Sequence, residues 1–268
     1  IHIYSHKRKI ERLNDCLNCL EWVFQTAKKQ DINDIVFCGD LFHERQKIDV
    51  LTYQKTFETF IKHVSEEDRR IHLLLGNHDM WYHQRRDVSS IIPFSSIPGV
   101  NVISKPCSQI IAGHSLSFLP YTHDPAEDIK NIPDRNILFG HVAIDGAVWN
   151  TKHNTKSQVM VEHDGDMTKV DAGIFKGFDQ VFLGHYHAEQ KLAHNVEYVG
   201  SPLQLSFGEA FQNKHIILLD LDTNHKEYIR NGFSPQHLIV DQSELDKCDL
   251  EGNFVQVMVE DTSDPEVL

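Results

Sequence analysis

The chain has 268 residues, of which 40% are hydrophobic and 24% charged, an ordinary composition for one large globular domain with a small appendage. Its formal net charge of −13 argues against a uniformly basic surface that wraps nucleic acid. No apolar run is long enough to span a bilayer, and nothing at the start resembles a secretion signal. The five cysteines are scattered, so we expect no disulfide scaffold and a reducing cytoplasm as the compartment.

The first hundred residues alternate between helical and strand patterns. Two segments carry apolar side chains at helical spacing, and each is followed by a short apolar run that ends in glycine and a polar residue. Cys16 and Cys19 form a C-x-x-C in the first helical segment, but without a second pair we expect neither zinc nor redox chemistry there. This repetition favours an α/β core. The expected elements are helices over residues 12–30 and 50–64 and strands over 34–38 and 71–75.

From about residue 101 the pattern changes to short apolar segments with turns between them, which predicts antiparallel pairing. We expect an α/β (α+β) fold in which two mixed β-sheets pack as a sandwich flanked by helices. Residues 1–232 would form the main domain, and residues 233–268 would begin a small second domain that the chain does not finish. The expected strands cover 101–104, 108–112, 116–121, 137–141, 181–184 and 196–202, followed by a hairpin over 214–230.

Four of the predicted strands end in glycine followed by Asp, Asn or His. Glycine lets the backbone turn closely beneath a site, and ligands of α/β sheets bind beyond the carboxyl ends of the strands. The 18 histidines are about three times the usual share, and Asp, Asn and His without thiolates suit Mn²⁺, Fe²⁺ or Zn²⁺. One Asp among several His can bridge two ions, the usual apparatus for phosphoester hydrolysis. The four strand ends are Gly39-Asp40, Gly76-Asn77, Gly140-His141 and Gly184-His185.

Motifs at these strand ends resemble, in order, those of the calcineurin-like metallophosphoesterase superfamily: GDLFH (39–43), GNHD (76–79), GH (140–141) and GHYH (184–187). Within it the chain is similar to the SbcD-type nucleases, which partner an SMC-like ATPase in double-strand-break processing. His43 follows Asp40 by three residues, where protein phosphatases of the superfamily carry Arg-Gly. The stretch YVGSPLQLSFGE (198–209) resembles the Gly-Ser-Pro…Ser-Phe segment of SbcD proteins. The resemblance covers roughly residues 1–230, and the segment after it is similar to the start of the family's capping domain.

The resemblance implies a metallophosphoesterase nuclease domain that holds two divalent ions, with Mn²⁺ favoured over Mg²⁺. Asp40 would bridge the ions, and the first motif, Asp-x-His, implies a further Asp directly before Ile1. His78 would face the scissile phosphate, Asp79 would orient its imidazole, and His43 would also lie near the phosphate. The remaining implied ligands are His2 and His187 for one ion and Asn77, His141 and His185 for the other.

The function that the resemblance implies is a DNA exonuclease and endonuclease, the nuclease subunit of an SbcCD-like complex. Its partners would be DNA and an SMC-type ATPase, with a homodimer inside a heterotetramer, no membrane, and a bacterial or phage-infected cytoplasm. Two alternatives stay open: a phosphodiesterase for small or cyclic nucleotides, and a catalytically silent scaffold for the ATPase. Two basic clusters are either solvated faces or a phosphate-contacting rim: Lys7, Arg8 and Lys9, and Arg85 and Arg86.

Overall fold

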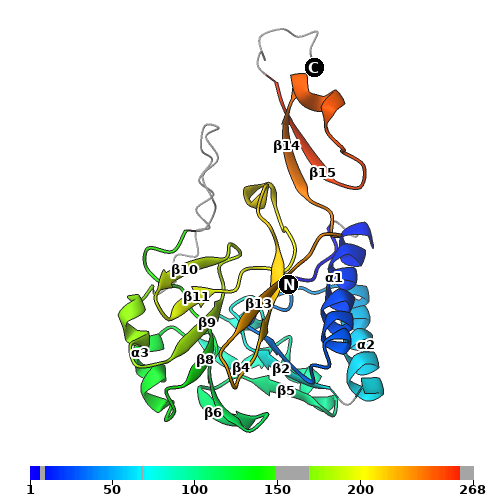
Figure 1. Cartoon of the computed structure of the whole chain (residues 1–268). Coiled ribbons are helices and arrows are strands. Elements are labelled where there is room, and N and C mark those ends of the chain that lie inside the picture. Colours follow the sequence, from blue (N-terminus) through cyan, green and yellow to red (C-terminus); the bar gives the residue numbers. More distant parts are fainter. Residues whose placement is uncertain (7–9, 68, 149–168, 260–268) are drawn as a thin grey trace.

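The computed structural model describes residues 1–6, 10–67, 69–148 and 169–259 (Figure 1). Among these residues, none of the helices is both long and apolar enough to cross a membrane. The long helices are α1 (Ile10–Lys29) and α2 (Val50–Glu67), with a short α3 (Pro125–Asp128) and 3₁₀ turns η1 (Ile92–Ser96), η2 (Ile129–Asn131), η3 (Ala172–Phe175), η4 (Phe207–Glu209) and η5 (Gln242–Lys247). The strands are β1 (Asp34–Phe37), β2 (Arg70–Leu74), β3 (Met80–Tyr82), β4 (Arg85–Ser89), β5 (Val100–Ile103), β6 (Cys107–Ile111), β7 (His114–Leu119), β8 (Ile137–His141), β9 (Gln180–Gly184), β10 (Gln190–Ala193), β11 (Val196–Tyr198), β12 (His215–Leu219), β13 (Lys226–Arg230), β14 (His237–Asp241) and β15 (Phe254–Met258).

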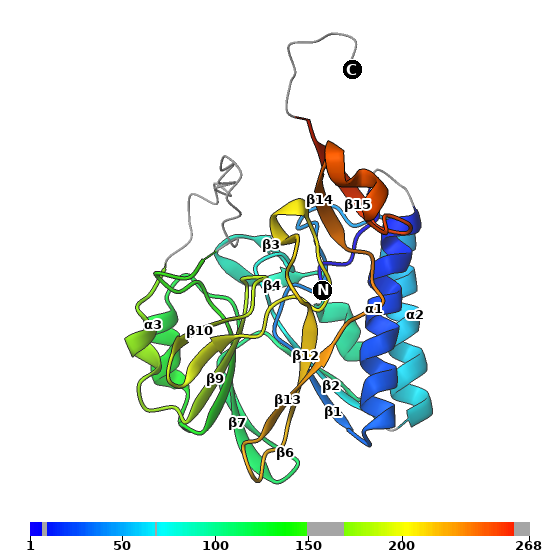
Figure 2. The same ribbon diagram turned by 45° about the horizontal axis from the view of Figure 1, so that its top comes forward.

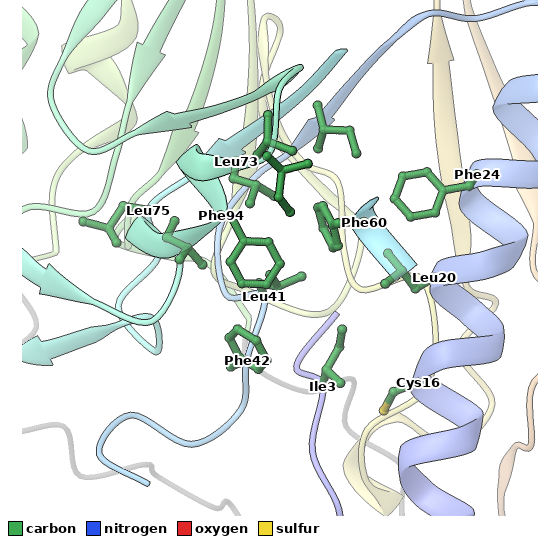
Figure 3. Packing of buried hydrophobic residues seen from close by; sticks show 14 of the residues in the cluster. Ile3, Cys16, Leu20, Phe24, Leu41, Phe42, Phe60, Leu73, Leu75 and Phe94 are labelled. Carbon is green, nitrogen blue, oxygen red and sulfur yellow. The ribbon is translucent and has the colours of Figure 1, made fainter. Parts of the chain in front are cut away.

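The first sheet is parallel and lies against the two long helices. Its strand order is β1-β2-β5, and α1 and α2 run side by side along it (Figure 2). The apolar stripes that predicted the helices form the core between this sheet and the helices (Figure 3). Phe24 of α1 and Phe60 of α2 meet edge to face, with ring centroids 5.6 Å apart, and both are fully buried. Both predicted helices and both early strands are confirmed, with bounds shifted by a few residues.

The second sheet is six-stranded and mixed, in the order β10-β11-β9-β8-β7-β6. Side chains of both sheets form one apolar cluster between them, including Leu74 and Ile103 from the first and Leu116, Phe118 and Phe182 from the second. A further apolar cluster, with α3 and η3 beside it, covers the other face of the larger sheet. The expected α/β fold with packed sheets is confirmed. Parallel and antiparallel pairing are mixed in the larger sheet, whereas the described strands of the smaller sheet are parallel.

One predicted pairing is wrong. The strand over 100–103 does not join the antiparallel group that follows it but pairs in parallel with β2. Antiparallel pairing begins only with β6 and β7, and β8 and β9 are again parallel. Spacing between short strands indicates how the chain turns locally, whereas parallel partners are set by packing across the fold. The sequence also did not predict the hairpin β3–β4, which has no apolar alternation.

Strands β12 and β13 pair as an antiparallel hairpin, which confirms the hairpin expected over 214–230. Strands β14 and β15 then pair in parallel with each other and project beyond the sandwich near the start of α1 (Figures 1 and 2). The backbone N–H of His237 donates to Oε1 of Gln204 at 2.6 Å, and the guanidinium of Arg12 lies 5.5 Å from the Phe254 ring centroid. These contacts attach the pair to the main body.

Candidate metal centre

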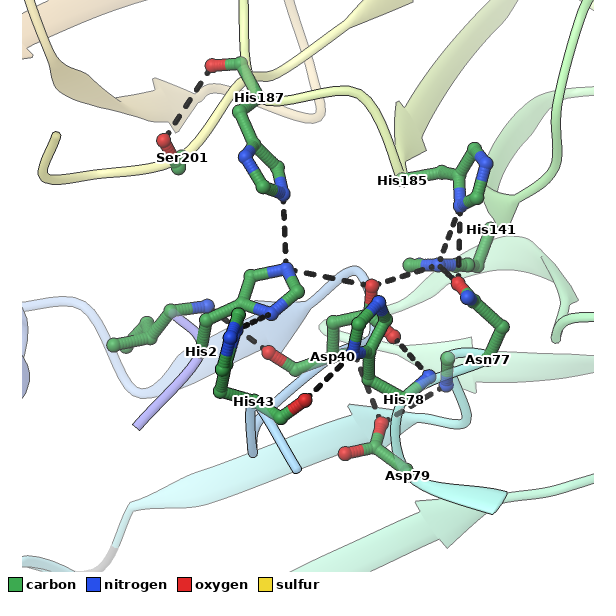
Figure 4. Close-up of polar contacts among 12 residues, drawn as sticks. His2, Asp40, His43, Asn77, His78, Asp79, His141, His185, His187 and Ser201 are labelled. Carbon is green, nitrogen blue, oxygen red and sulfur yellow. Dashed lines mark hydrogen bonds and ion pairs between the residues drawn. The ribbon is translucent and has the colours of Figure 1, made fainter. Parts of the chain in front are cut away.

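The four glycine-terminated strands, two from each sheet, end at one edge of the sandwich. The residues after β1 and β2 therefore face the residues at the ends of β8 and β9 (Figure 4). Two glycines make this approach possible. Gly39 has φ of +90°, and a Cβ there would lie 2.2 Å from Nδ1 of His141. A Cβ on Gly184 would lie 1.9 Å from the carbonyl oxygen of Cys38. Any larger residue at either position would push the two sheets apart where the site forms.

On one side of the site, four buried side chains converge. Oδ1 of Asn77 lies 2.9 Å from Nε2 of His141 and 3.0 Å from Nδ1 of His185. The two imidazole nitrogens are 3.3 Å apart, and Nε2 of His141 is 3.3 Å from Oδ2 of Asp40. Potential ligand atoms of Asp40, His141 and His185 all lie within 4.8 Å of one another. We call these four residues the inner half-site.

On the other side of Asp40 lie His2 and His187, which we call the outer half-site. Nε2 of His2 is 3.5 Å from Oδ2 of Asp40, the same oxygen that approaches His141. Nε2 of His187 lies 3.0 Å from Nε2 of His2. The carboxylate of Asp40 therefore lies between the two half-sites, as Figure 4 shows. All six side chains that the motif resemblance singled out as ligands meet in one place.

The chemistry of this donor set fits bound cations. A carbonyl oxygen can only accept, so the 2.7 Å contact with the carbonyl of Cys38 requires a proton on Nδ1 of His141. Nε2 of a neutral His141 then points a lone pair at two further acceptors, the carboxylate of Asp40 and Oδ1 of Asn77. Buried acceptors that face one another without a donor are costly, so a proton or a metal ion must lie among them. The set of oxygen and imidazole ligands suits a first-row divalent metal.

The pKa values indicate how the cluster behaves without metal. Burial alone would raise the pKa of Asp40, but the neighbouring imidazoles of His141 and His78 hold it well below its usual range. Burial opposes charge on His141 as well, yet the carboxylate of Asp40 outweighs it and raises the pKa of His141. Burial lowers the pKa of His185 to about 3 and that of His43 to about 4. These directions favour a proton on His141 beside Asp40 and oppose protonation of His185 and His43.

Three of these residues have strained backbones. His2, Asp40 and His185 have positive φ angles of 58°, 53° and 103°, a region that side chains with a Cβ rarely adopt. Such strain costs on the order of 1–3 kcal/mol per residue and persists only where the surroundings enforce it. Here it lies at the residues whose side chains converge, which agrees with a functional rather than a structural role.

A carboxylate that the sequence reasoning did not assign holds the outer half-site. Glu209 is 2% exposed, and its Oε1 accepts from Nδ1 of His187 at 2.9 Å, which directs Nε2 of that ring towards His2. Its Oε2 lies 2.7 Å from Nζ of Lys214 and accepts from Oγ of Ser201 and the N–H of Leu205. Burial opposes its charge, but the His187 ring and the Lys214 ammonium lower the pKa of Glu209 to about 2. Glu209 ends the stretch that resembles SbcD proteins, but that resemblance gave it no role.

His78 lies beside Asp40, but it is oriented by a different group from the one expected. The backbone N–H of His78 donates to Oδ1 of Asp40 at 2.8 Å, and its ring Nδ1 lies 2.6 Å from the carbonyl oxygen of His43. The carboxylate of Asp79 instead accepts from the N–H groups of Asp40, Leu41, Phe42 and Gly76 at 2.9–3.3 Å. The expected role of Asp79 is therefore corrected: it fixes the loop that carries Asp40.

His43 also lies within the site. Its ring centroid is 5.5 Å from that of His2 and 5.8 Å from that of His78, and ligand atoms of these three imidazoles lie within 4.8 Å of one another. The proposed catalytic histidines therefore stand on the same side of Asp40 as the outer half-site. The buried inner half-site, with Asn77, His141 and His185, lies on the opposite side of Asp40.

The two basic clusters have different outcomes. Lys7, Arg8 and Lys9 lie outside the described residues. Arg85 is exposed, is paired with Asp87, and stacks its guanidinium 4.4 Å from the Tyr82 ring centroid. Arg86 is half-buried, donates to the carbonyl of Tyr121 at 2.8 Å and forms an ion pair with Asp128. Arg86 therefore ties β4 to the main body, while Arg85 is the one of these two whose charge faces solvent.

Comparison with known proteins gives three informative relatives. Exonuclease subunit 1 of Enterobacteria phage T4 is 23% identical over 217 residues, which cover 79% of this chain and 60% of the phage protein. The SbcD component of the nuclease SbcCD from Escherichia coli K12 is 22% identical over 271 aligned positions. These positions cover 86% of this chain and 64% of the relative. The SbcD component from Staphylococcus epidermidis is 36% identical over 90 residues, 33% of this chain and 22% of the relative.

The chain therefore spans slightly less than two thirds of the length of the first two relatives. A sequence profile gives the family directly: that of the calcineurin-like phosphoesterases matches residues 1–189. This match covers more than half of the chain and includes all six converging side chains, from His2 to His187. The protein belongs to the calcineurin-like phosphoesterase family.

Proposed function

We propose that this protein is a dinuclear-metal nuclease that hydrolyses backbone phosphodiesters of DNA as an exonuclease and endonuclease. The observation that carries the proposal is the position of one carboxylate oxygen. Oδ2 of Asp40 lies 3.3 Å from Nε2 of His141 and 3.5 Å from Nε2 of His2, between two sets of ligands. The nuclease names of the relatives from phage T4 and Escherichia coli support DNA as the substrate.

In this proposal the chain's own residues divide the work. Asn77, His141, His185 and the shared Asp40 would hold one divalent ion, and His2 and His187 would hold the other, with Mn²⁺ favoured over Mg²⁺. Bound in this way, the ions would activate water and stabilise the charge of the transition state. The orientation of His141 by the carbonyl of Cys38, and of His187 by Glu209, presents Nε2 of each ring to its ion.

His78 would act on the phosphate itself. Because its Nδ1 contacts a carbonyl oxygen, that nitrogen carries a proton, and Nε2 is the atom left to face the substrate. As an imidazolium it would stabilise the phosphate or protonate the leaving oxygen. His43 would contribute in two ways, through its ring near the phosphate and through the carbonyl that orients His78.

The experiment is a substrate panel for the purified chain. Linear duplex DNA, bis(p-nitrophenyl) phosphate and cyclic nucleotides are each incubated with Mn²⁺, with Mg²⁺ or with a chelator, alongside the Asp40→Asn variant. We expect Mn²⁺-dependent cleavage of DNA that Asp40→Asn abolishes. Hydrolysis of the small esters or cyclic nucleotides without DNA cleavage would support a small-molecule phosphodiesterase instead, and inactivity on every substrate would support a silent scaffold.

The wider setting belongs to the same proposal. The SbcCD names of two relatives support an SMC-type ATPase partner, and we propose a homodimer of the nuclease within a heterotetramer. Residues 1–232 would form the nuclease domain, and residues 233–268, which include β14 and β15, would begin a capping domain. The bacterial and phage relatives support a role in DNA repair, recombination or replication in a bacterial or phage-infected cytoplasm. The acidic net charge of −13 predicts weak DNA affinity without the ATPase.

A further inference from the structure

Within the described residues, the imidazole of His43 lacks the short hydrogen bond that orients three other histidines of the site. The rings of His78, His141 and His187 have polar partners at 2.6, 2.7 and 2.9 Å. The polar contact of the His43 ring is with Nδ1 of His2, and the two nitrogens are 3.4 Å apart, too far for a strong hydrogen bond. Because the outer side-chain torsion of histidine has no sharp preference, this contact alone does not fix the ring.

Tyr4 stacks on the His43 ring, with ring centroids 4.6 Å apart and planes inclined by 33°. The backbone brings the two residues together, because Ile3 pairs in parallel with Phe42. Tyr4 and His43 come next on these two segments, so their side chains leave the same face of the pair. The His78 ring also stacks against His43, with centroids 5.8 Å apart and planes inclined by 23°. Ring contacts rather than hydrogen bonds therefore hold the His43 imidazole.

The Tyr4 ring is in turn supported by Arg12 of α1. The guanidinium carbon lies 5.5 Å from the Tyr4 ring centroid, within the range of a cation–π contact. Arg12 is 5% exposed and is fixed by its own partners. Its Nη2 donates to the carbonyl of Gln204 at 2.7 Å, and its Nη1 lies 3.7 Å from the carboxylate of Asp15. A buried guanidinium with these partners gives the Tyr4 ring a fixed support.

We propose that Tyr4, supported by Arg12, is a positioning residue that holds the His43 imidazole in the orientation in which it acts. This inference rests on the proposed function, in which His43 lies near the scissile phosphate. The described ring contacts of Tyr4 are with His43 and Arg12, and neither is one of the six converging side chains. Loss of the Tyr4 ring should therefore slow the chemical step, which depends on orientation, without weakening metal binding.

The first test separates catalysis from binding. Tyr4→Ala removes the ring and Tyr4→Phe keeps it. The matched control, Tyr228→Ala, removes a tyrosine whose ring contacts a histidine outside the site, His215, with centroids 5.0 Å apart. With bis(p-nitrophenyl) phosphate and saturating Mn²⁺, we expect Tyr4→Ala to lower kcat about tenfold, while KM and the Mn²⁺ affinities from isothermal titration change by less than about twofold. Tyr4→Phe and Tyr228→Ala should both retain the kcat of the parent.

The second test does not depend on activity. In metal-free protein with labelled histidine, nuclear Overhauser contacts between the His43 ring and the rings of His2 and His78 report the orientation of His43. Tyr4 takes part in neither contact, so its removal acts on them only by letting His43 turn. We expect Tyr4→Ala to remove these contacts and Tyr4→Phe to retain them.

An unchanged kcat, unchanged Overhauser contacts, or a loss in Tyr4→Ala that Tyr4→Phe shares would each overturn the proposal. So would equal losses of kcat and Mn²⁺ affinity, because Tyr4 would then support the fold of the whole site. If the parent hydrolyses no substrate, the proposed function fails, and the Overhauser contacts alone decide whether Tyr4 positions His43. If Tyr4→Ala fails to fold, Tyr4→Leu, which keeps apolar volume without an aromatic face, replaces it in both tests.

Discussion

The inner and outer half-sites share Asp40 but are built in different ways. The inner one is formed by strand ends of both sheets, and His141, Asn77 and His185 are at most 6% exposed. The outer one is more open on one side: the His187 side chain is 19% exposed, although His2 is buried. The pairing of β8 with β9 positions His141, whereas the orientation of His187 depends on Glu209. The inner half-site should therefore tolerate changes in its surroundings better than the outer one.

The largest effect is expected where the two half-sites meet. Asp40→Asn keeps the side-chain shape but removes the charge that two ions would share. Phosphodiester hydrolysis should therefore fall by about 10³-fold or more, beyond the 10- to 100-fold loss typical of residues that only orient a metal ligand. Metal analysis should show loss of at least one ion. Asp249→Asn, at an exposed position, is the control, and hydrolysis by Asp40→Asn within tenfold of the parent would contradict the bridging role.

The next effect separates the half-sites. Glu209→Gln leaves the inner ligands untouched but weakens the acceptor that orients His187, so we expect a 10- to 100-fold loss of affinity for the more weakly bound ion. Isothermal titration with Mn²⁺ measures both affinities, and Glu251→Gln, on the surface, is the control. Equal losses at the two sites would show that Glu209 supports the whole fold rather than His187.

The pH dependence of stability reports on the inner half-site. The pKa of His141 is raised above its ordinary 6.5, so its ion pair with Asp40 contributes stability that is fully present below pH 6.5. That contribution is lost as the pH rises through the raised value. In chelator, the unfolding midpoint should therefore fall across this range, while Mn²⁺ should offset the fall, by about 2.7 kcal/mol at a hundredfold excess over Kd. Thermal scans from pH 6 to 9 measure this, and a Mn²⁺ effect that shrinks as pH rises would contradict it.

The smallest effect concerns the basic hairpin outside both half-sites. Arg85→Ala removes a solvent-facing charge and should reduce the salt slope of DNA binding by up to about one ion, with little change in stability. Arg86→Ala should lower stability instead, because Arg86 joins β4 to Asp128 and Tyr121. An unchanged salt slope in the double variant would remove this hairpin from the DNA-binding surface.

Much of the inner half-site could be predicted because its signals are local. A glycine and a polar residue directly after an apolar run mark a strand end, and strand ends in α/β folds meet at one edge. The groups that orient His141 and His187 could not be found in this way. The carbonyl of Cys38 lies 103 residues from His141 in sequence, and Glu209 lies 22 residues from His187, so only the folded chain brings them together. The parallel pairing of β5 with β2 was missed for the same reason.

The most direct test of the metal centre is anomalous scattering from crystals of the Mn²⁺-loaded protein, collected at the manganese absorption edge. We expect two peaks about 3.5–4 Å apart, one on each side of the Asp40 carboxylate, within ligand distance of His141 and His185 and of His2 and His187. A single peak, or peaks that do not contact Asp40, would contradict a dinuclear site bridged by this residue.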